Sequence, residues 1–250
     1  MQTIVVSNRK GGSAKTTTAV NLSASLALKN RVLLIDFDTQ GHSSIGVGCK
    51  PVEERGIHSI FLGETLSFTF VPTAIKNLTL SPANEFFDVY SYPNLDWVLK
   101  QRFRDEKIDE FFDYCIIDTP PTYDTLLKNA ISVANCVIIP VVPHHLGAIG
   151  VSQMVRAIYQ TSMKSGNEIS LVGILPVMYN SHIKEHDTVL SDLKKEFGED
   201  KFFEPIKIDI EIASSFAKQK PIVTYNSRLR GARDYKRFSD DLIKKLNKGT

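Results

Sequence analysis

Residues 10–17 carry the side chains with the clearest chemistry in the sequence: two glycines, then a lysine followed by hydroxyl residues. In a phosphate-binding loop, backbone N–H groups surround the phosphates, a lysine contacts the outer phosphates, and a Ser or Thr hydroxyl joins the shell of Mg²⁺. Lys15 and Thr16 have the types and the spacing for the last two roles. We therefore expect ATP and Mg²⁺ to bind at Lys10, Gly11, Gly12, Ser13, Ala14, Lys15, Thr16 and Thr17.

Carboxylates stand at the ends of two short apolar runs. Asp36 and Asp38 follow residues 32–35, and Asp118 follows residues 114–117. The second run ends in Asp-Thr-Pro-Pro, the physical form of a Walker B element, whose aspartate contacts Mg²⁺ through water. We expect Thr16 and Asp118 at the metal. A structural role, in which the Asp36 and Asp38 carboxylates cap the next turn, stays open.

The elements that position these residues follow from the apolar pattern. Short runs rich in β-branched residues predict buried parallel strands, and longer segments with apolar residues three and four apart predict helices. Their alternation indicates an α/β fold, a doubly wound and mostly parallel sheet flanked by helices, as in P-loop NTPases. The expected strands are 3–6, 32–35, 114–117, 136–142 and 169–177, and the expected helices are 16–28, 124–134, 148–164, 183–197 and 232–246.

The bulk composition is that of a globular protein, with 250 residues, 42% hydrophobic and 23% charged. We expect one P-loop ATPase domain over residues 1–250, with an irregular elaboration at about 51–110 and a basic C-terminal helix at about 229–247. The three cysteines are far apart and in no CxxC pair, so neither a disulfide framework nor a metal cluster is supported. The start lacks signal-peptide features, and no apolar run approaches the roughly 18 residues of a membrane span. The expected location is the cytoplasm.

Charge is unevenly distributed along the chain. Residues 201–250 hold 12 Lys and Arg against 6 Asp and Glu, whereas the whole chain has a net charge of +2. A basic C-terminal fifth on a mildly acidic body indicates a face for a polyanion, with nucleic acid the usual candidate. A solvated helix surface explains the charge equally well.

Several segments resemble the ParA/MinD group of P-loop ATPases, which also includes the nitrogenase iron protein. Lys10 and the glycine pair match its deviant Walker A loop, KGGxxK followed by Ser or Thr. Residues 36–41 resemble its DxDPQG element, with Thr39 in place of proline, and residues 118–121 resemble its DxPP signature. Residues 134–143, 220–226 and 228–232 resemble Soj-type partition proteins. The likeness covers nearly the whole chain and is weakest at 51–110.

This resemblance implies a particular catalytic arrangement. Lys10 would cross a dimer interface to the nucleotide of the partner, Lys15 would bind the phosphates, and Asp38 would orient or activate the attacking water. Asp36 and Gln40 would help to hold the switch loop and the water shell of Mg²⁺, so that Asp36, like Asp118, would contact the metal through water. Hydrolysis would be slow until the dimer completes the site.

The resemblance also implies partners and a cellular role. A ParA/Soj-like partition ATPase would form a homodimer on ATP binding, bind DNA without sequence preference, and meet a ParB-like or other adaptor that stimulates hydrolysis. It would be nucleoid-associated in the cytoplasm and would position a plasmid, a chromosome or another cargo. The basic residues proposed to contact DNA are Arg228, Arg230, Arg233, Lys236 and Arg237, and we expect some of these only to cap or solvate the final helix.

Two other classes stay in view. A MinD-like membrane-cycling ATPase would need a C-terminal amphipathic helix that inserts apolar side chains into lipid. A redox protein related to the nitrogenase iron protein would need cysteines that hold a metal cluster between two subunits. Ala14 departs from the plain Walker pattern, in which glycine normally precedes the lysine. Two features depart from the Soj pattern: the acidic residues Asp209 and Glu211, where arginine is frequent, and the loose match at 51–110.

Overall fold

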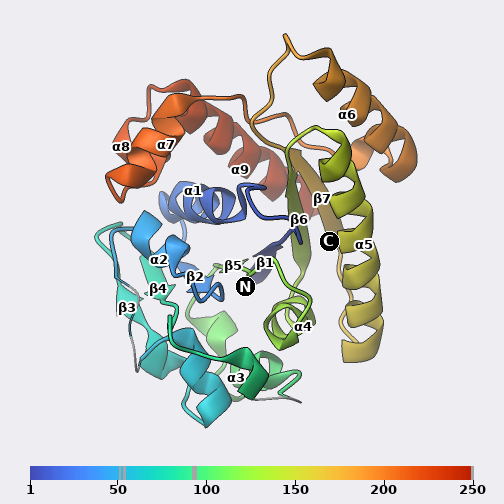
Figure 1. The fold of residues 1–250 in the computed structure, drawn as a ribbon. Helices are drawn as coiled ribbons and strands as arrows, with labels where there is room; N and C mark the ends of the chain where they lie inside the picture. The colour runs from blue at the N-terminus through green and yellow to red at the C-terminus, as the bar shows by residue number, and fades with distance from the viewer. Residues whose placement is uncertain (51, 53–54, 92–94, 249–250) are drawn as a thin grey trace.

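The computed structural model describes residues 1–50, 52, 55–91 and 95–248. Within these residues the strands form a seven-stranded sheet in the order β3-β4-β2-β5-β1-β6-β7, with helices on both faces (Figure 1). The strands are β1 (Gln2–Val6), β2 (Val32–Asp36), β3 (Val71–Pro72), β4 (Leu78–Ser81), β5 (Tyr114–Asp118), β6 (Cys136–Val141) and β7 (Leu171–Pro176).

The sheet is parallel except for the β3–β4 pair. The prediction of a doubly wound, mostly parallel sheet is thus confirmed. Strands buried on both faces explain why these runs are apolar without alternation. Parallel pairing also brings the strand ends together: Asp118 lies in register with both Val6 and Asp36. The carboxylates therefore meet at the edge of the sheet from which the phosphate-binding loop leaves.

Two apolar clusters cover the faces of the sheet. Alternate residues of β1 show the division, since Ile4 and Val6 pack in one cluster and Val5 in the other. The first cluster is covered mainly by α1 (Lys15–Ala27), α8 (Ile222–Tyr225) and α9 (Arg230–Lys248), with α2 (His42–Gly46) and α7 (Ile210–Ala217) nearby. The second is covered mainly by α3 (Val98–Asp105), α4 (Thr125–Ser132), α5 (His145–Ser165) and α6 (Lys184–Phe197). Short 3₁₀ turns are η1 (Ile57–Leu62), η2 (Ser67–Thr69), η3 (Val89–Ser91), η4 (Ile108–Glu110) and η5 (Glu199–Lys201).

The elaboration predicted at 51–110 is only partly irregular; its residues 51, 53–54 and 92–94 lie outside the described residues. Here β4 pairs in parallel with β2, and β3 closes against β4, so the segment extends the sheet. The β4 sequence Leu-Thr-Leu-Ser alternates apolar and hydroxyl residues, so it lacks the continuous apolar run by which the other strands were predicted. The helices α2, α3, α7 and α8, which have four to eight residues, were not predicted.

The C-terminal helix α9 buries its apolar side. Tyr235, Phe238 and Leu242 are each no more than 1% exposed and pack against the α1 side of the sheet. None of the described helices combines the length and the apolar character that a membrane span requires.

Candidate nucleotide site

The phosphate-binding loop joins β1 to α1 and is fastened to the neighbouring strand. Asn8 donates from Nδ2 to the Pro140 carbonyl on β6 (2.8 Å) and accepts the Lys10 N–H at Oδ1 (3.1 Å). Inside the loop, the Ser13 hydroxyl donates to the Lys10 carbonyl (2.9 Å). Nothing in the sequence singled out Asn8, since its role depends on β6 lying beside β1. The loop shape is thus held by contacts within the chain.

Lys15 begins α1 and is only 7% exposed. Its Nζ donates to the Lys10 carbonyl at 3.2 Å. Burial lowers the pKa of Lys15, while the charges of Asp118 and Asp38 act in the opposite direction. A partly desolvated ammonium group at a helix N-terminus has much to gain from a bound phosphate.

Ala14 adopts a left-handed conformation, with φ 59° and ψ 30°. This is the conformation that the glycine usual at this position reaches without steric cost. For alanine the left-handed region costs about 1–2 kcal/mol. The methyl group is thus accommodated, with some backbone strain immediately before Lys15.

Replacing Ala14 by glycine is expected to raise the free energy of unfolding by up to about 1 kcal/mol. Glycine relieves the backbone strain of the folded state, and the greater conformational entropy of the unfolded glycine variant offsets part of this gain. Chemical denaturation without nucleotide measures this change. The matched control is Gly12→Ala, since Gly12 also has a positive φ (72°) and a methyl group there would meet no other described atom within 4 Å. Equal stability of all three proteins would contradict the assignment of strain to Ala14.

Asp36 and Asp118 are fully buried and adjacent in register. Asp118 accepts the Ser43 hydroxyl at Oδ2 (2.8 Å), and Asp36 accepts the Ser44 N–H (2.7 Å) and hydroxyl (2.8 Å) at its Oδ2. Within the described residues, the Oδ1 atoms of both aspartates have no hydrogen-bond partner. Unpartnered buried carboxylate oxygens are costly without a cation, and hard cations such as Mg²⁺ prefer oxygen ligands. These residues fit a magnesium site.

The pKa values of the two carboxyls agree with this interpretation. Burial raises the pKa of Asp118 to about 6, opposed by the hydroxyls of Thr16 and Ser43. Burial and the charge of Asp118 raise the pKa of Asp36 well above its usual range. Asp36 also fixes the start of α2 through Ser44, so the structural role left open for Asp36 is present alongside the proposed metal contact.

Asp38 is half-buried and lies at the mouth of this site. Its Oδ1 accepts the Gln40 N–H at 3.1 Å, and its carbonyl accepts the Gly41 N–H at 2.8 Å. Its charge acts on the pKa values of Lys15, Asp36 and Asp118. Of the three aspartates, Asp38 is therefore the one that is accessible to solvent, and it lies close enough to Lys15 to affect its charge.

Lys10 differs from Lys15 in its contacts. Its side chain has no hydrogen bond or ion pair with any residue that the structure describes, whereas its backbone is held at both N–H and carbonyl. A methyl group on Gly150 of α5 would come within 4.0 Å of the Lys10 Cβ and 3.2 Å of Asn8 Oδ1. The loop and α5 are thus in close contact, and the Lys10 amine is left unpaired among these residues.

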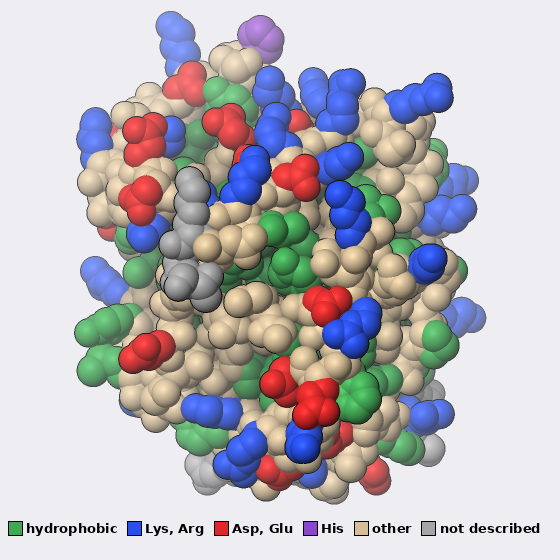
Figure 2. Space-filling model, turned by 180° about the vertical axis from the view of Figure 1, so that it is seen from behind, with side chains coloured by type: hydrophobic (Ala, Val, Ile, Leu, Met, Phe, Trp, Pro, Cys, Tyr) green, Lys and Arg blue, Asp and Glu red, His purple; other side chains and the backbone are tan. Residues whose placement is uncertain are grey.

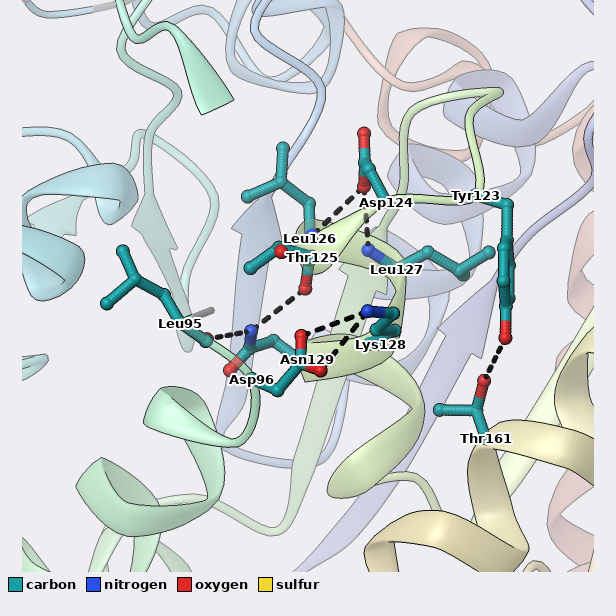
Figure 3. A network of polar contacts seen from close by, with 10 residues as sticks. All are labelled: Leu95, Asp96, Tyr123, Asp124, Thr125, Leu126, Leu127, Lys128, Asn129 and Thr161. Atoms are coloured by element: carbon teal, nitrogen blue, oxygen red, sulfur yellow. Dashed lines mark hydrogen bonds and ion pairs between the residues drawn. The ribbon is translucent and has the colours of Figure 1, made fainter. Parts of the chain in front are cut away.

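The loop that follows Asp118 is anchored at both ends. The Thr119 hydroxyl contacts the Val6 carbonyl and the Ser7 hydroxyl (3.1 and 2.8 Å). Asp124 caps α4 by accepting the N–H groups of Leu126 and Leu127 (Figure 3). From the same segment, Tyr123 reaches Thr161 of α5, and Lys128 pairs with Asp96 at 3.1 Å. These contacts hold in place the segment that follows the Walker B aspartate.

The predicted DNA-contacting residues fall into two groups. Arg230 and Arg237 are held within the chain: Arg230 donates to the Ile208 carbonyl and lies 4.0 Å from Asp209, and Arg237 donates to Asp234 and the Pro205 carbonyl, each at 3.1 Å. A role in DNA binding for these two therefore stays a prediction, and it would have to compete with these contacts within the chain. The other three, Arg228, Arg233 and Lys236, are exposed and their side chains have no partner among the described residues.

The acidic residue at position 209 explains part of this division. Asp209 caps α7 by accepting the Glu211 N–H (3.1 Å) and also accepts the Gly231 N–H at the start of α9 (2.8 Å). It joins two helix N-termini and lies beside the Arg230 guanidinium. The sequence departure noted at Asp209 thus has a structural role.

A parallel sheet, a glycine loop that opens a helix, a buried lysine and a Walker B aspartate together define a P-loop NTPase. Comparison with known proteins agrees. The family model described as an AAA domain matches residues 1–171. The chain is 29% identical to the sporulation initiation inhibitor protein Soj of Bacillus subtilis, covering 93% of this chain and 94% of that protein. It is also 29% identical to the chromosome-partitioning ATPase Soj of Thermus thermophilus, covering 97% and 96%.

Solved structures show the same fold. A Mycobacterium smegmatis protein described as cobyrinic acid a,c-diamide synthase, with bound ADP and magnesium, is 28% identical with a TM-score of 0.82 over 100% of this chain and 97% of that one. Apo McdA of Cyanothece has a TM-score of 0.86 at 19% identity, over 97% and 99%. The chain belongs to the ParA/Soj-like ATPase family with a deviant Walker A loop.

Proposed function

We propose that this protein is a ParA-like ATPase that closes an ATP-sandwich dimer, binds DNA without sequence preference, and positions a plasmid, chromosome or other cargo through partner-stimulated hydrolysis. The observation that carries the proposal is the Lys10 amine, which has no partner among the described residues. Asp38 and Asp118, by contrast, act on the charge of Lys15 within the same chain. A lysine so placed is available to a second subunit.

The residues divide the chemistry of phosphoryl transfer between them. Lys15 binds the outer phosphates, the N-terminus of α1 adds a favourable field, and Asp38 holds the attacking water in line. Mg²⁺, held near Thr16 and Asp118, supplies charge neutralisation on the phosphate oxygens. Lys10 of the other subunit completes the phosphate site. Each chain alone then lacks one cation, which makes hydrolysis slow in the monomer.

The ligands bound in a similar structure support the proposal that this chain binds a nucleotide with Mg²⁺. The Mycobacterium smegmatis structure was solved with ADP and magnesium. In this chain, the buried Oδ1 atoms of Asp36 and Asp118, which have no hydrogen-bond partner among the described residues, support binding of Mg²⁺.

Basic side chains support the DNA-binding part of the proposal. Figure 2 shows Lys and Arg side chains gathered over the upper part of the molecule, interspersed with Asp and Glu. In Figure 1 this part is formed by α6 to α9. Arg228, Arg233 and Lys236 are the exposed members of the predicted set without a partner in the described chain, so we assign them the phosphate contacts.

Binding to random duplex DNA is expected to require ATP and to weaken steeply with salt. Arg228→Ala and Arg233→Ala are each expected to lower the slope of log K against log salt by about 0.9, since each lost phosphate contact removes one released counterion. Arg237→Ala is the matched control, because its guanidinium is already held by Asp234 and Pro205. Fluorescence anisotropy across a salt series measures the slopes. Equal affinity with ADP and ATP, or unchanged slopes, would reject this role.

The two alternative classes receive less support. A membrane-inserting α9 would have to release Tyr235, Phe238 and Leu242 from the core. A cluster bridging two subunits would need accessible cysteines, but Cys115 and Cys136 are fully buried in β5 and β6. Only the half-buried Cys49 then remains.

A further inference from the structure

His58 is a fully buried histidine in η1, within the segment where the family resemblance is weakest. Its Nε2 lies 3.2 Å from the Phe37 carbonyl, and its Nδ1 lies 3.1 Å from the Asn84 backbone nitrogen. A carbonyl only accepts and an amide N–H only donates, so Nε2 carries the proton and Nδ1 accepts. Both ring nitrogens are therefore used, and the tautomer is determined by its two partners.

The carbonyl that His58 contacts belongs to the residue between Asp36 and Asp38. A second contact reaches the same loop from the neighbouring residue: the Ala83 N–H donates to the Ser44 hydroxyl (3.3 Å), which donates to Asp36 Oδ2 (2.8 Å). The consecutive N–H groups of residues 83 and 84, just beyond β4, are thus linked to loop 36–44 through two separate side chains. Two links, at Asp36 and at Phe37, restrict both translation and rotation of the backbone that carries Asp38.

The surroundings of His58 are built to keep this ring in place. His58 stacks on Phe87 with ring centroids 4.8 Å apart, and Phe37 lies 6.1 Å away. Burial lowers the pKa of His58 to about 4, so the ring is neutral at physiological pH. Gly56 allows the close approach of the chain, because a Cβ there would lie 2.7 Å from the Asn84 nitrogen. A neutral imidazole with both nitrogens satisfied holds a fixed geometry.

We propose that His58 is a positioning residue for Asp38: its hydrogen bond to the Phe37 carbonyl holds the water-orienting carboxylate in place, and residues 83–84 are the fixed point behind it. This inference rests on the proposed role of Asp38 in ATP hydrolysis. Neither hydrogen bond of His58 involves residues 10–17, so His58 acts on turnover and leaves nucleotide binding nearly unchanged.

The first test compares two substitutions of the same residue. His58→Phe keeps a stacking ring and removes both hydrogen bonds, whereas the amide of His58→Gln can still donate to the Phe37 carbonyl. His58→Phe is expected to lower kcat by about 10- to 10²-fold, since small misplacements of catalytic groups have effects of this size. His58→Gln is expected to recover most of the loss. Affinity for MgADP, measured by titration calorimetry, is expected to change little in either variant.

The second test does not require turnover. Hydrogen exchange of the backbone amides of residues 37–44 is expected to become faster in His58→Phe and to stay near the native rate in His58→Gln. The control is Thr69→Val, which removes a buried hydroxyl bonded to Ser81 and Leu66 in the same segment but touches neither link. This control is expected to lower stability without a local change at 37–44.

The outcomes separate this inference from the proposed function. If His58→Phe and His58→Gln lose equal activity, or if exchange at 37–44 changes no more than in Thr69→Val, His58 is a packing residue and the inference is wrong. If the native protein with Mg²⁺ does not hydrolyse ATP, the proposed function fails, and the exchange experiment alone decides whether His58 fixes the loop.

Discussion

Replacing Lys10 by alanine is expected to lower ATP turnover by about 10³-fold, the lower range measured for cations supplied across an interface in related phosphoryl transfer. Nucleotide binding to the monomer is expected to persist, because the buried Lys15 remains in place. Dimerisation with ATP, followed by light scattering, is expected to persist but to require a higher protein concentration. The control is Arg9→Ala, which removes an exposed cation one residue away.

A mixing experiment distinguishes a role in the same subunit from a role in the partner. Lys10→Ala chains keep Asp38, and Asp38→Asn chains keep Lys10, so a mixed dimer has one complete site if Lys10 crosses the interface. Equal mixing of two inactive proteins is then expected to restore roughly a quarter of native turnover, since half the dimers are mixed and one of two sites is complete. If mixing restores nothing, Lys10 acts within its own chain or has no catalytic role.

Replacing Asp118 by asparagine is expected to stabilise the protein without ligand and to reduce the stability that it gains from MgADP. Burial raises the pKa of Asp118 to about 6 from its ordinary value of 3.8. Between these pH values the folded chain holds a proton that the unfolded chain has lost, so the free energy of unfolding falls as pH rises. Above pH 6 the ionised Asp118 carboxylate lowers the free energy of unfolding by its full amount, about 3 kcal/mol. Asparagine carries no charge and removes this destabilisation.

Denaturation at pH 7.5 with and without MgADP measures both effects. The native protein is expected to gain stability from MgADP, and the Asp118→Asn variant is expected to start more stable and gain less. Asp113→Asn is a control of opposite sign, because Arg31 lowers the pKa of Asp113 and its carboxylate therefore favours folding. A less stable Asp118→Asn protein would show that the buried charge is already compensated within the chain.

The sequence predicted that the residues of the candidate nucleotide site lie together, because these residues follow strong local patterns. Lys15, Asp38 and Asp118 each stand at the end of an apolar strand or beside glycines, where the chain order alone predicts a shared edge. The long strands and helices were predicted for the same reason. Their boundaries shifted by a few residues; α5, for example, begins at His145 because the His144 side chain caps it.

Other parts of the site depend on contacts between distant segments. Ser43 meets Asp118 across 75 positions, and Asn8 meets Pro140 across 132. No short pattern specifies such pairs. The basic surface shows the same limit of local patterns, because Arg230 and Arg233 look alike in sequence, yet only Arg230 of the two lies beside Asp209 in the described chain. Charge counts predicted the region, and tertiary contacts determine which side chains are free.

Helix α1 connects the nucleotide site with the C-terminal helices α8 and α9. It begins at Lys15, packs against α9 and accepts the Ile222 N–H of α8 at Asn21 (2.8 Å). If ATP raises the affinity for DNA through this helix, DNA must raise the affinity for ATP, because the coupling free energy between two binding sites is reciprocal. DNA would then tighten ATP binding by the same factor, so bound DNA would raise the fraction of molecules that hold ATP.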